Sequence, residues 1–323
     1  MPEIVPPEVP PSGGQFEISF GDQRATIVEV GGGVRTYDVG ARAVLDPYEV
    51  GEICDGVHGA PLIPWPNRLA DGRYRFNGVD YQVALTEPEK ANAIHGFLHW
   101  RNWVVQAGET EWVKAHEPAD IVMGTVLYPL SGYPFTIDVR VGYHLDAHGL
   151  TVTTTATNIG RTPAPWACGA HPYLSPGDGL IDEAELELRA AIRIDTDAHR
   201  QLPTAVVPTA GTPFDFATRR RLGDLKIDFA FRGLDRDRDG RAWVRLTGLD
   251  GQTAVLWIDA SFPLVEIYTG DTMPPHCRRR GLGVEPMSAP PNAFASGDDV
   301  IRLEPEQTIV HRWGAQLQPA AVT

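Results

Sequence analysis

The sequence lacks both the long apolar runs of membrane proteins and the excess of positive charge that is typical of nucleic-acid-binding proteins. It contains no stretch of about eighteen consecutive apolar residues, the length that a transmembrane helix requires. Its 42 acidic residues outnumber its 28 basic residues, which gives a formal net charge of −14. Such a charge does not favour binding to polyanions. We therefore expect no nucleic acid and no membrane among its partners.

Cysteine is also scarce, because Cys54, Cys168 and Cys277 are the only three in 323 residues. Three widely spaced cysteines are too few for a disulfide framework and do not have the spacing of zinc ligands. They indicate free thiols in a reducing cytoplasm, the expected location, and no metal site. The beginning, MPEIVPPEVPPSGGQ, lacks the basic and apolar regions of a secretory signal. We interpret residues 1–14 as a flexible, proline-rich tail.

Amphipathic helix patterns of about ten residues or more are missing as well, and strand patterns take their place. In PFTIDVRVGYHL, residues 134–145, apolar side chains from Phe135 to Leu145 alternate with polar ones. This period of two is that of a half-buried strand. The 33 glycines and 28 prolines are spread over the whole length, so turns are frequent and no linker stands out. The sequence predicts an all-β protein, most simply one large antiparallel sandwich.

Two stretches carry polar residues that folding alone does not require. In PLIPWPNRLADGRYRFNG, Asn67 and Arg68 follow a run of prolines and a tryptophan. A guanidinium there suits either a structural ion pair or a hydroxyl-rich or anionic ligand. In NAIHGFLHW, His95 and His99 have the spacing of metal ligands on a helix, but Gly96 and the aromatic neighbours indicate a strand or loop. Because no acidic third ligand is spaced suitably, we expect no metal here.

Two further motifs hold an imidazole and a carboxylate in rigid settings. In GAHPYL, Pro172 keeps His171 out of the helical region and fixes the direction of its backbone. That setting suits either a buried structural histidine or a proton donor of fixed orientation. In GLGVEPMSAPPNAF, Glu285 stands between an apolar residue and a proline, and burial there would raise its pKa toward the range of a general base. Asp228 lies inside the apolar run IDFAF.

Several common catalytic motifs are missing from the sequence. It has no nucleophilic serine elbow, no phosphate-binding loop and no metal-binding box. What remains is two histidines, a carboxylate base, an arginine and an aspartate that suits hydroxyl groups. This set of side chains suits proton transfer on a small polar molecule without a cofactor.

Six motifs occur in the order found in aldose 1-epimerases, also called galactose mutarotases. They are NRLADGRYRFNG, NAIHGF, GAHPYL, DFAF, EIYTG and GLGVEPMSAPPNAF. The chain resembles that family from about residue 15 to residue 315. The resemblance implies a β-supersandwich formed by a single domain, residues 15–323, and a reaction that interconverts the α and β anomers of an aldose. It also implies a small sugar as substrate and no cofactor.

The resemblance also implies a role for each motif residue. Glu285 matches the general base, His171 the general acid, and His95 the second histidine, which contacts the ring oxygen of the sugar. The residues that match the positions holding sugar hydroxyls are Asn67, Arg68 and Asp228. Two acid–base groups of this kind each contribute about 10²- to 10⁴-fold in rate.

Two departures from the family pattern concern the identity of the sugar. The segment LTEPEKANAIHGF is closer to a bacterial subgroup that includes sulfoquinovose mutarotases, and HCRRRG precedes GLGVEP. We expect Arg278–Arg280 to form a solvated loop and the substrate to be a neutral hexose. The alternatives are an epimerase for an anionic sugar, such as a hexose 6-phosphate or sulfoquinovose, and a catalytically silent carbohydrate-binding protein. A monomer or a homodimer is expected.

Overall fold

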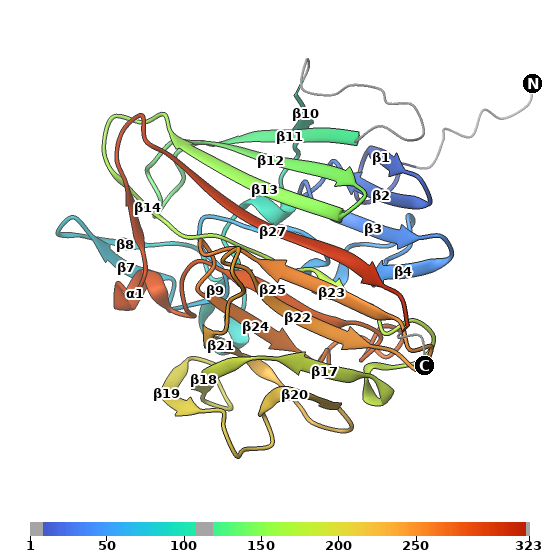
Figure 1. The fold of residues 1–323 in the computed structure, drawn as a ribbon. Helices are drawn as coiled ribbons and strands as arrows, with labels where there is room; N and C mark the ends of the chain where they lie inside the picture. Colours follow the sequence, from blue (N-terminus) through green and yellow to red (C-terminus); the bar gives the residue numbers. More distant parts are fainter. Residues whose placement is uncertain (1–8, 107–118, 321–323) are drawn as a thin grey trace, which may run out of the picture.

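Two large antiparallel sheets dominate the computed structural model, which describes residues 9–106 and 119–320 (Figure 1). The first sheet has twelve strands, in the order β1 (Gln15–Phe20), β2 (Gln23–Val28), β3 (Val34–Val39), β4 (Arg42–Leu45), β16 (Tyr173–Leu174), β25 (Leu282–Met287), β24 (Leu264–Tyr268), β21 (Asp228–Leu234), β18 (Ala190–Thr196) and β19 (Pro203–Pro208), with β15 (Gly169–Ala170) joining β25 to β5 (Pro61–Leu62). The second sheet has nine strands, in the order β10 (Val104–Val105), β11 (Ala119–Leu127), β12 (Ile137–Asp146), β13 (Gly149–Asn158), β27 (Thr308–Gln318), β23 (Thr253–Ile258), β22 (Ala242–Thr247), β17 (Glu185–Leu188) and β20 (Phe216–Arg221).

The remaining elements are short. Three two-stranded pairs are β6 (Arg68–Ala70) with β9 (Asn92–Ile94), β7 (Arg73–Phe76) with β8 (Val79–Gln82), and β14 (Ala164–Trp166) with β26 (Ile301–Leu303). One four-residue α-helix, α1 (Ala293–Ser296), and four 3₁₀ turns, η1 (Asp55–Val57), η2 (Pro88–Lys90), η3 (Leu98–Trp100) and η4 (Ile181–Glu183), complete the described part of the chain. The predicted all-β sandwich is therefore confirmed.

The long strands of the second sheet follow the predicted alternation. Buried and half-buried residues alternate along the whole of β12, and Val139, Val141 and Tyr143 are among those that face the core. β13 pairs with β12 over its full length and continues the pattern. One face of these strands therefore packs against the first sheet, and the other face contacts solvent.

Large aromatic side chains fill the space between the sheets. Trp65, Trp103, Trp166 and Trp313 are fully buried within one contiguous apolar cluster. Side chains of this size bury the largest apolar area per residue, so they contribute strongly to core stability. The core gives the loops at the edge of the first sheet a rigid support.

The centre of the first sheet is covered on both faces. Every residue of β25 is buried, and four of the five residues of β24 are buried. Two carboxylic acids nevertheless lie in these strands: Glu266 and Glu285 are cross-strand partners, and each is 2% exposed. Buried ionisable groups are expensive unless they are paired or neutral, so this position needs a chemical explanation.

The N-terminal segment that we interpreted as a tail lies partly outside the described residues, which begin at residue 9. The N–H of Val30 donates to the carbonyl oxygen of Ser12 at 2.9 Å, and the N–H of Gly14 donates to Glu29 Oε2 at 2.9 Å. The chain is thus attached to the sheet shortly before β1.

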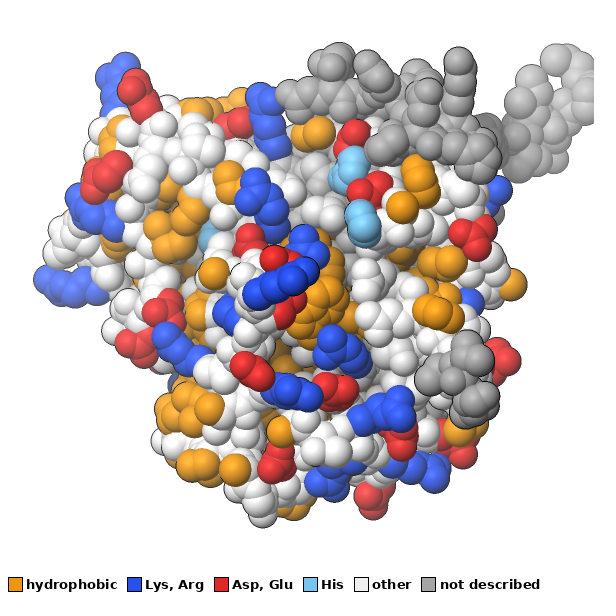
Figure 2. Space-filling model, viewed as in Figure 1, with side chains coloured by type: hydrophobic (Ala, Val, Ile, Leu, Met, Phe, Trp, Pro, Cys, Tyr) orange, Lys and Arg blue, Asp and Glu red, His pale blue; other side chains and the backbone are white. Residues whose placement is uncertain are grey.

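The surface mixes both signs of charge. Figure 2 shows acidic and basic side chains interspersed around a hydrophobic patch on the face where the nine-stranded sheet lies in front. Among the described residues, no helix has the length and apolar character that crossing a bilayer requires.

The arginine run corrects one expectation, because Arg279 is not solvated. It is 8% exposed, and its Nε donates to Asp182 Oδ1 at 3.0 Å while its Nη1 donates to both carboxylate oxygens of Asp271 at 3.1 and 3.2 Å. Two backbone carbonyl oxygens accept further hydrogen bonds from the same guanidinium. The sequence did not predict this structural ion pairing, because a run of three arginines is typical of an exposed loop and the carboxylate partners lie elsewhere in the chain.

Arg280 is also held in place, and only Arg278 is exposed. The Nε of Arg280 donates to Asp46 Oδ1 at 2.8 Å. Arg278 donates from Nε to the carbonyl oxygen of Met273 at 3.3 Å, and its side chain is otherwise at the surface. The expectation of a solvated loop therefore holds for one of the three residues.

We expect Arg279→Gln to destabilise the fold by about 3 kcal/mol, because it leaves two carboxylates and two carbonyl groups without their donor. For a protein of this size the midpoint of thermal unfolding should fall by roughly 5–10 °C. Differential scanning calorimetry measures both quantities. Arg278→Gln is the matched control and should shift the midpoint little. Equal midpoints for the two variants would contradict this account of the loop.

Candidate active site

A cavity of about 250 Å³ lies beside the central strands of the first sheet. All six residues singled out from the sequence line it: Asn67, Arg68, His95, His171, Asp228 and Glu285. None of Arg278–Arg280 is among its lining residues. The motif residues come from segments far apart in the sequence and line one cavity. The order of the motifs along the chain could not establish that they meet.

His171 is fixed by its backbone and by ring stacking. It lies between β15 and β16, where its N–H donates to Ala60 O at 3.1 Å and its carbonyl oxygen accepts from Gly59 N at 2.9 Å. Its imidazole stacks on the ring of Tyr173, with centroids 4.8 Å apart, and His58 stacks on Tyr173 at 3.9 Å. The direction of the His171 ring is therefore set by the surrounding structure.

Glu285 meets His171 directly. The Nε2 atom of His171 lies 3.1 Å from Glu285 Oε1, and both side chains are almost completely buried. The other polar atoms of the pair, His171 Nδ1 and Glu285 Oε2, have no hydrogen-bond partner among the described residues. Buried polar atoms without partners are rare. They are atoms that a polar ligand would satisfy.

His95 has a defined tautomer. Its Nδ1 accepts the N–H of Asn67 at 3.2 Å, so in the neutral imidazole the Nε2 atom carries the proton and acts as a donor. The backbone of His95 is left-handed (φ 61°), and so is that of Gly96 (φ 68°). A Cβ on Gly96 would lie 2.0 Å from Ile63 O. Only glycine fits there, which explains the HG pair in the motif.

The three cavity residues His95, His171 and Glu285 each offer an atom within 4.8 Å of the others, a grouping that could hold a metal ion. A metal ligand must present a lone pair. In His95 the lone pair of Nδ1 accepts the Asn67 N–H and Nε2 carries the proton, while His171 Nε2 contacts Glu285. These hydrogen bonds favour a site for proton transfer over a metal centre.

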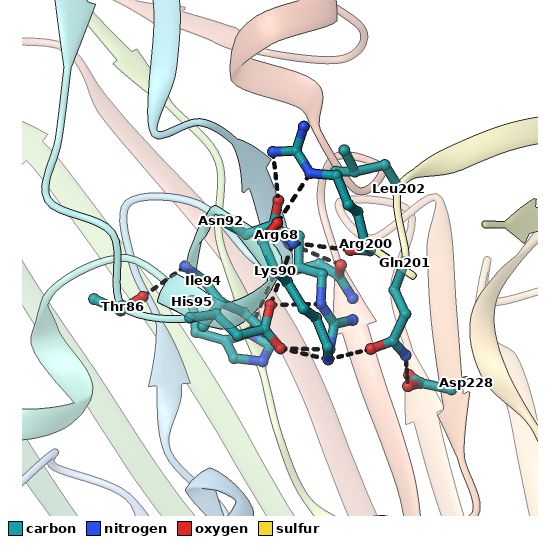
Figure 3. A network of polar contacts seen from close by, with 12 residues as sticks. Arg68, Thr86, Lys90, Asn92, Ile94, His95, Arg200, Gln201, Leu202 and Asp228 are labelled. Carbon is teal, nitrogen blue, oxygen red and sulfur yellow. Dashed lines mark hydrogen bonds and ion pairs between the residues drawn. The ribbon is translucent and has the colours of Figure 1, made fainter. Parts of the chain in front are cut away.

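A series of charged and amide side chains connects Arg68 to Asp228 at the side of the cavity (Figure 3). Arg68 donates from Nε and Nη2 to the two oxygens of Glu87 at 2.9 and 3.1 Å. Lys90 donates to Glu87 Oε1 at 2.7 Å and also to the Gln201 side-chain oxygen, while the Gln201 amide donates to Asp228. The orientation of Asp228 therefore depends on that of Arg68 through three intermediate side chains.

The turn that carries Gln201 is itself anchored. The neighbouring Arg200, labelled in Figure 3, donates to the carbonyl oxygen of Ala91 at 2.7 Å and to Asp71 Oδ1 at 2.9 Å. Asp197 accepts hydrogen bonds from the backbone of residues 199, 200 and 202. The turn and the loop that follows β6 are thus fastened together beside the cavity.

Glu266 is a lining residue that our sequence analysis missed. Burial raises its pKa to about 8, with the negative charge of Asp228 as the next cause. Its Oε2 has no hydrogen-bond partner among the described residues. An available signal was its place inside the apolar run PLVEIYTG, because an acidic residue in a buried strand is unusual without a function. Asp228 in IDFAF carries the same signal.

The cavity favours neutral forms of its ionisable groups. Burial, followed by the charges of Glu266 and Asp228, raises the pKa of Glu285 well above its usual range. Burial also lowers the pKa of His171 to about 3, with His58 as the next cause, and lowers the pKa of His95. Both shifts favour neutral His171 and protonated Glu285 over the charged pair at neutral pH.

Comparisons with known proteins identify the family of the chain. The model of the family described as aldose 1-epimerase matches residues 15–315. The uncharacterised protein YihR of Escherichia coli K12 is 33% identical over 294 residues, which cover 91% of this chain and 90% of that protein.

Two solved structures show the same fold. A galactose mutarotase-like protein from Clostridium acetobutylicum has a TM-score of 0.82 at 17% identity, and 97% of each chain is covered. Galactose 1-epimerase from Lactobacillus acidophilus has a TM-score of 0.78 at 15% identity, and 95% of each chain is covered.

We expect Glu266→Gln to lower the pKa of Glu285, because the neutral amide removes the like charge that opposes ionisation of its cross-strand partner. The measurement is the ¹³C NMR titration of the side-chain carboxyl groups in protein labelled at glutamate. Glu187→Gln, on β17 and outside the cavity, is the control and should leave that titration unchanged. An unchanged or higher pKa of Glu285 in Glu266→Gln would contradict the coupling.

Proposed function

The chain belongs to the aldose 1-epimerase family, and from this premise we propose that it interconverts the α and β anomers of a hexose by opening and closing the sugar ring. The observation that carries the proposal is the contact between His171 Nε2 and Glu285 Oε1, 3.1 Å long, in the wall of a cavity. An acid and a base that share one proton at this distance suit a reaction that moves one proton to and one from the substrate.

In the proposed mechanism the shared proton first passes from Glu285 to His171; Glu285 then accepts the proton of the anomeric hydroxyl, and protonated His171 donates its proton to the ring oxygen. The bond between C1 and the ring oxygen breaks, and the open-chain aldehyde forms. Rotation about the C1–C2 bond presents the other face of the carbonyl group. On closure His171 takes the proton back, and Glu285 returns its proton to the carbonyl oxygen, so that the pair ends as it began.

The burial of the pair supports this mechanism. Ring opening converts charged His171 and charged Glu285 into their neutral forms, and burial favours those neutral forms by raising the pKa of Glu285 and lowering that of His171. The cavity therefore stabilises the proton distribution that accompanies the open chain, relative to the one that accompanies the ring.

The other lining residues have roles in binding. The free Nε2–H of His95 suits a hydrogen bond to the ring oxygen. Asn67, Arg68 and Asp228 suit sugar hydroxyls, and the link from Arg68 through Glu87, Lys90 and Gln201 holds Asp228 in place. Rigid donors and acceptors of this kind lower the entropy cost of orienting the sugar.

The charges that line the cavity favour a neutral hexose over an anionic one. Arg68 is the single basic side chain among the lining residues, and the acidic ones are Asp228, Glu266 and Glu285. The guanidinium of Arg68 is already paired with Glu87. Because this guanidinium is already paired and burial favours the protonated forms of Glu266 and Glu285, a phosphate or sulfonate group would meet no unpaired cation here, a cost that a hydroxyl group avoids.

We expect Glu285→Gln and His171→Asn each to lower kcat by about 10²-fold or more, because each removes one of the two groups that transfer protons. The assay is ¹H NMR exchange between anomers of glucose and galactose, with glucose 6-phosphate and sulfoquinovose beside them. Circular dichroism checks that the fold is kept.

Three outcomes of this assay would argue against the proposal. A variant that retains a tenth of the wild-type kcat would contradict the assigned role of that residue. Sugar binding by the wild-type protein without exchange would favour a silent carbohydrate-binding protein. A tenfold preference for either anion would favour the anionic substrate.

We also expect kcat/KM to fall at both ends of the pH range. The active pair carries one proton, so a second proton on His171 inactivates it at low pH, and loss of the single proton inactivates it at high pH. The pKa of His171 is lowered to about 3 and that of Glu285 is raised, which makes the plateau broad and puts the basic limb above neutrality. The profile follows from initial exchange rates between pH 2.5 and pH 10, which include both limbs, and a rate that stays constant to the basic end would contradict the shared proton.

A further inference from the structure

A second group of metal-binding side chains lies outside the catalytic cavity. Asp55 begins the 3₁₀ turn Asp55–Val57, and His276 and Cys277 lie in the segment that leads to β25. A carboxylate oxygen, an imidazole nitrogen and a thiol sulfur from these three residues all lie within 4.8 Å of one another. The group joins positions more than two hundred residues apart, so no short spacing along the chain predicts it.

The ligand atoms of this group are available. Cys277 Sγ makes one weak contact, at 3.5 Å to Pro274 O. Within residues 9–106 and 119–320, the Asp55 carboxylate and the His276 imidazole have no hydrogen bond or ion pair. Both side chains are exposed, whereas Cys277 is buried. In the catalytic cavity, by contrast, the accepting nitrogen of His95 is occupied by the Asn67 N–H.

The two segments form part of the wall of the catalytic cavity. Gly56 and Val57 line it from one segment, and Thr272 and Met273 line it from the other. The segments are in close contact there, because a Cβ on Gly56 would lie 2.6 Å from Met273 Cε. An ion held by Asp55, His276 and Cys277 would therefore tie together two neighbouring parts of the wall.

We propose that Asp55, His276 and Cys277 bind a divalent transition-metal ion of the Zn²⁺ class and that this ion fastens the cavity wall. A mixed set of sulfur, nitrogen and oxygen ligands suits Zn²⁺, whereas Mg²⁺ and Ca²⁺ prefer oxygen ligands alone. Three protein ligands leave one tetrahedral position for water. With metal–ligand bonds of about 2.0–2.3 Å the ligand atoms would be about 3.5 Å apart, a small closure that two exposed side chains allow.

Binding by a thiolate makes the site sensitive to pH. A cysteine binds a metal ion as the thiolate, which has lost the thiol proton. The metal displaces that proton, and the apparent affinity should rise with pH.

The binding test titrates the full-length, metal-free protein with Zn²⁺ by isothermal calorimetry and with Co²⁺ by absorption. We expect one ion per chain and a thiolate-to-Co²⁺ charge-transfer band. Cys277→Ser should abolish the band, and Cys277→Ser, His276→Asn and Asp55→Asn should each weaken Zn²⁺ binding by about tenfold or more. Cys54→Ser, which changes a nearby thiol outside the group, is the control and should retain both signals.

The proposal is overturned if Zn²⁺ does not bind, or if Cys277→Ser binds as the wild-type protein does. It is also overturned if binding is lost in His95→Asn and kept in Cys277→Ser, because the ion would then occupy the catalytic cavity. The readouts are binding and absorption, so they stand whether or not the protein is a mutarotase.

The effect on the wall has its own readout in the exchange assay. A fastened wall should lower KM for the sugar about two- to fivefold at saturating Zn²⁺, since less of the binding energy is spent on ordering the segments. The value of kcat should stay unchanged, and Cys277→Ser should show neither effect. An unchanged KM in the wild-type protein would overturn the fastening part of the proposal.

Discussion

The free-energy cost of burying ionisable side chains on two adjacent buried strands, β24 and β25, is the constraint on which this structure depends. Glu266 and Glu285 face each other across β24 and β25, in a part of the sheet where nearly every residue is buried. Burial opposes ionisation of both carboxyl groups, and one guanidinium, Arg68, lies among them. The cavity therefore holds protons at neutral pH. A site that stores protons next to imidazole groups is suited to acid–base chemistry rather than to electrostatic capture of an anion.

The surrounding fold keeps these groups at fixed distances. The imidazole of His171 is stacked on Tyr173, which in turn stacks on His58. His58 Nε2 contacts Asp46 at 3.1 Å, and Asp46 accepts from Arg280. Arg280 thus supports His171 from behind, and none of the three consecutive arginines lines the cavity. Because each member of this series contacts the next, a change at the surface would reach His171 through four contacts.

Patterns within short stretches of sequence were enough to predict the features that depend on residues close together along the chain. The alternation along residues 134–145 predicted β12, since the pleat of a strand sends successive side chains to opposite faces. The setting of His171 before a proline and of Glu285 inside an apolar stretch marked two lining residues. The resemblance to a family added His95, Arg68 and the other motif residues, which spacing alone left open.

The features that could not be predicted from the sequence depend on contacts between residues far apart along the chain. Lys90 and Gln201 are 111 residues apart, and Arg279 and Asp182 are 97 residues apart. Neither pair has a spacing that a strand or helix period would reveal. Glu266 was the exception, because a carboxylate inside an apolar run is a local signal.

Differences in environment assign the carboxyl groups of the cavity to separate tasks. Asp228 accepts the amide of Gln201 at the side of the cavity, so its oxygens are oriented by a neutral donor that Lys90 holds. Glu285 lacks a partner for one oxygen and shares the other with His171. The negative charge of Glu266 raises the pKa of Glu285. The negative charge of Asp228 in turn raises the pKa of Glu266. In the proposed reaction, different contacts therefore control the binding of hydroxyl groups, at Asp228, and the transfer of protons, at Glu285.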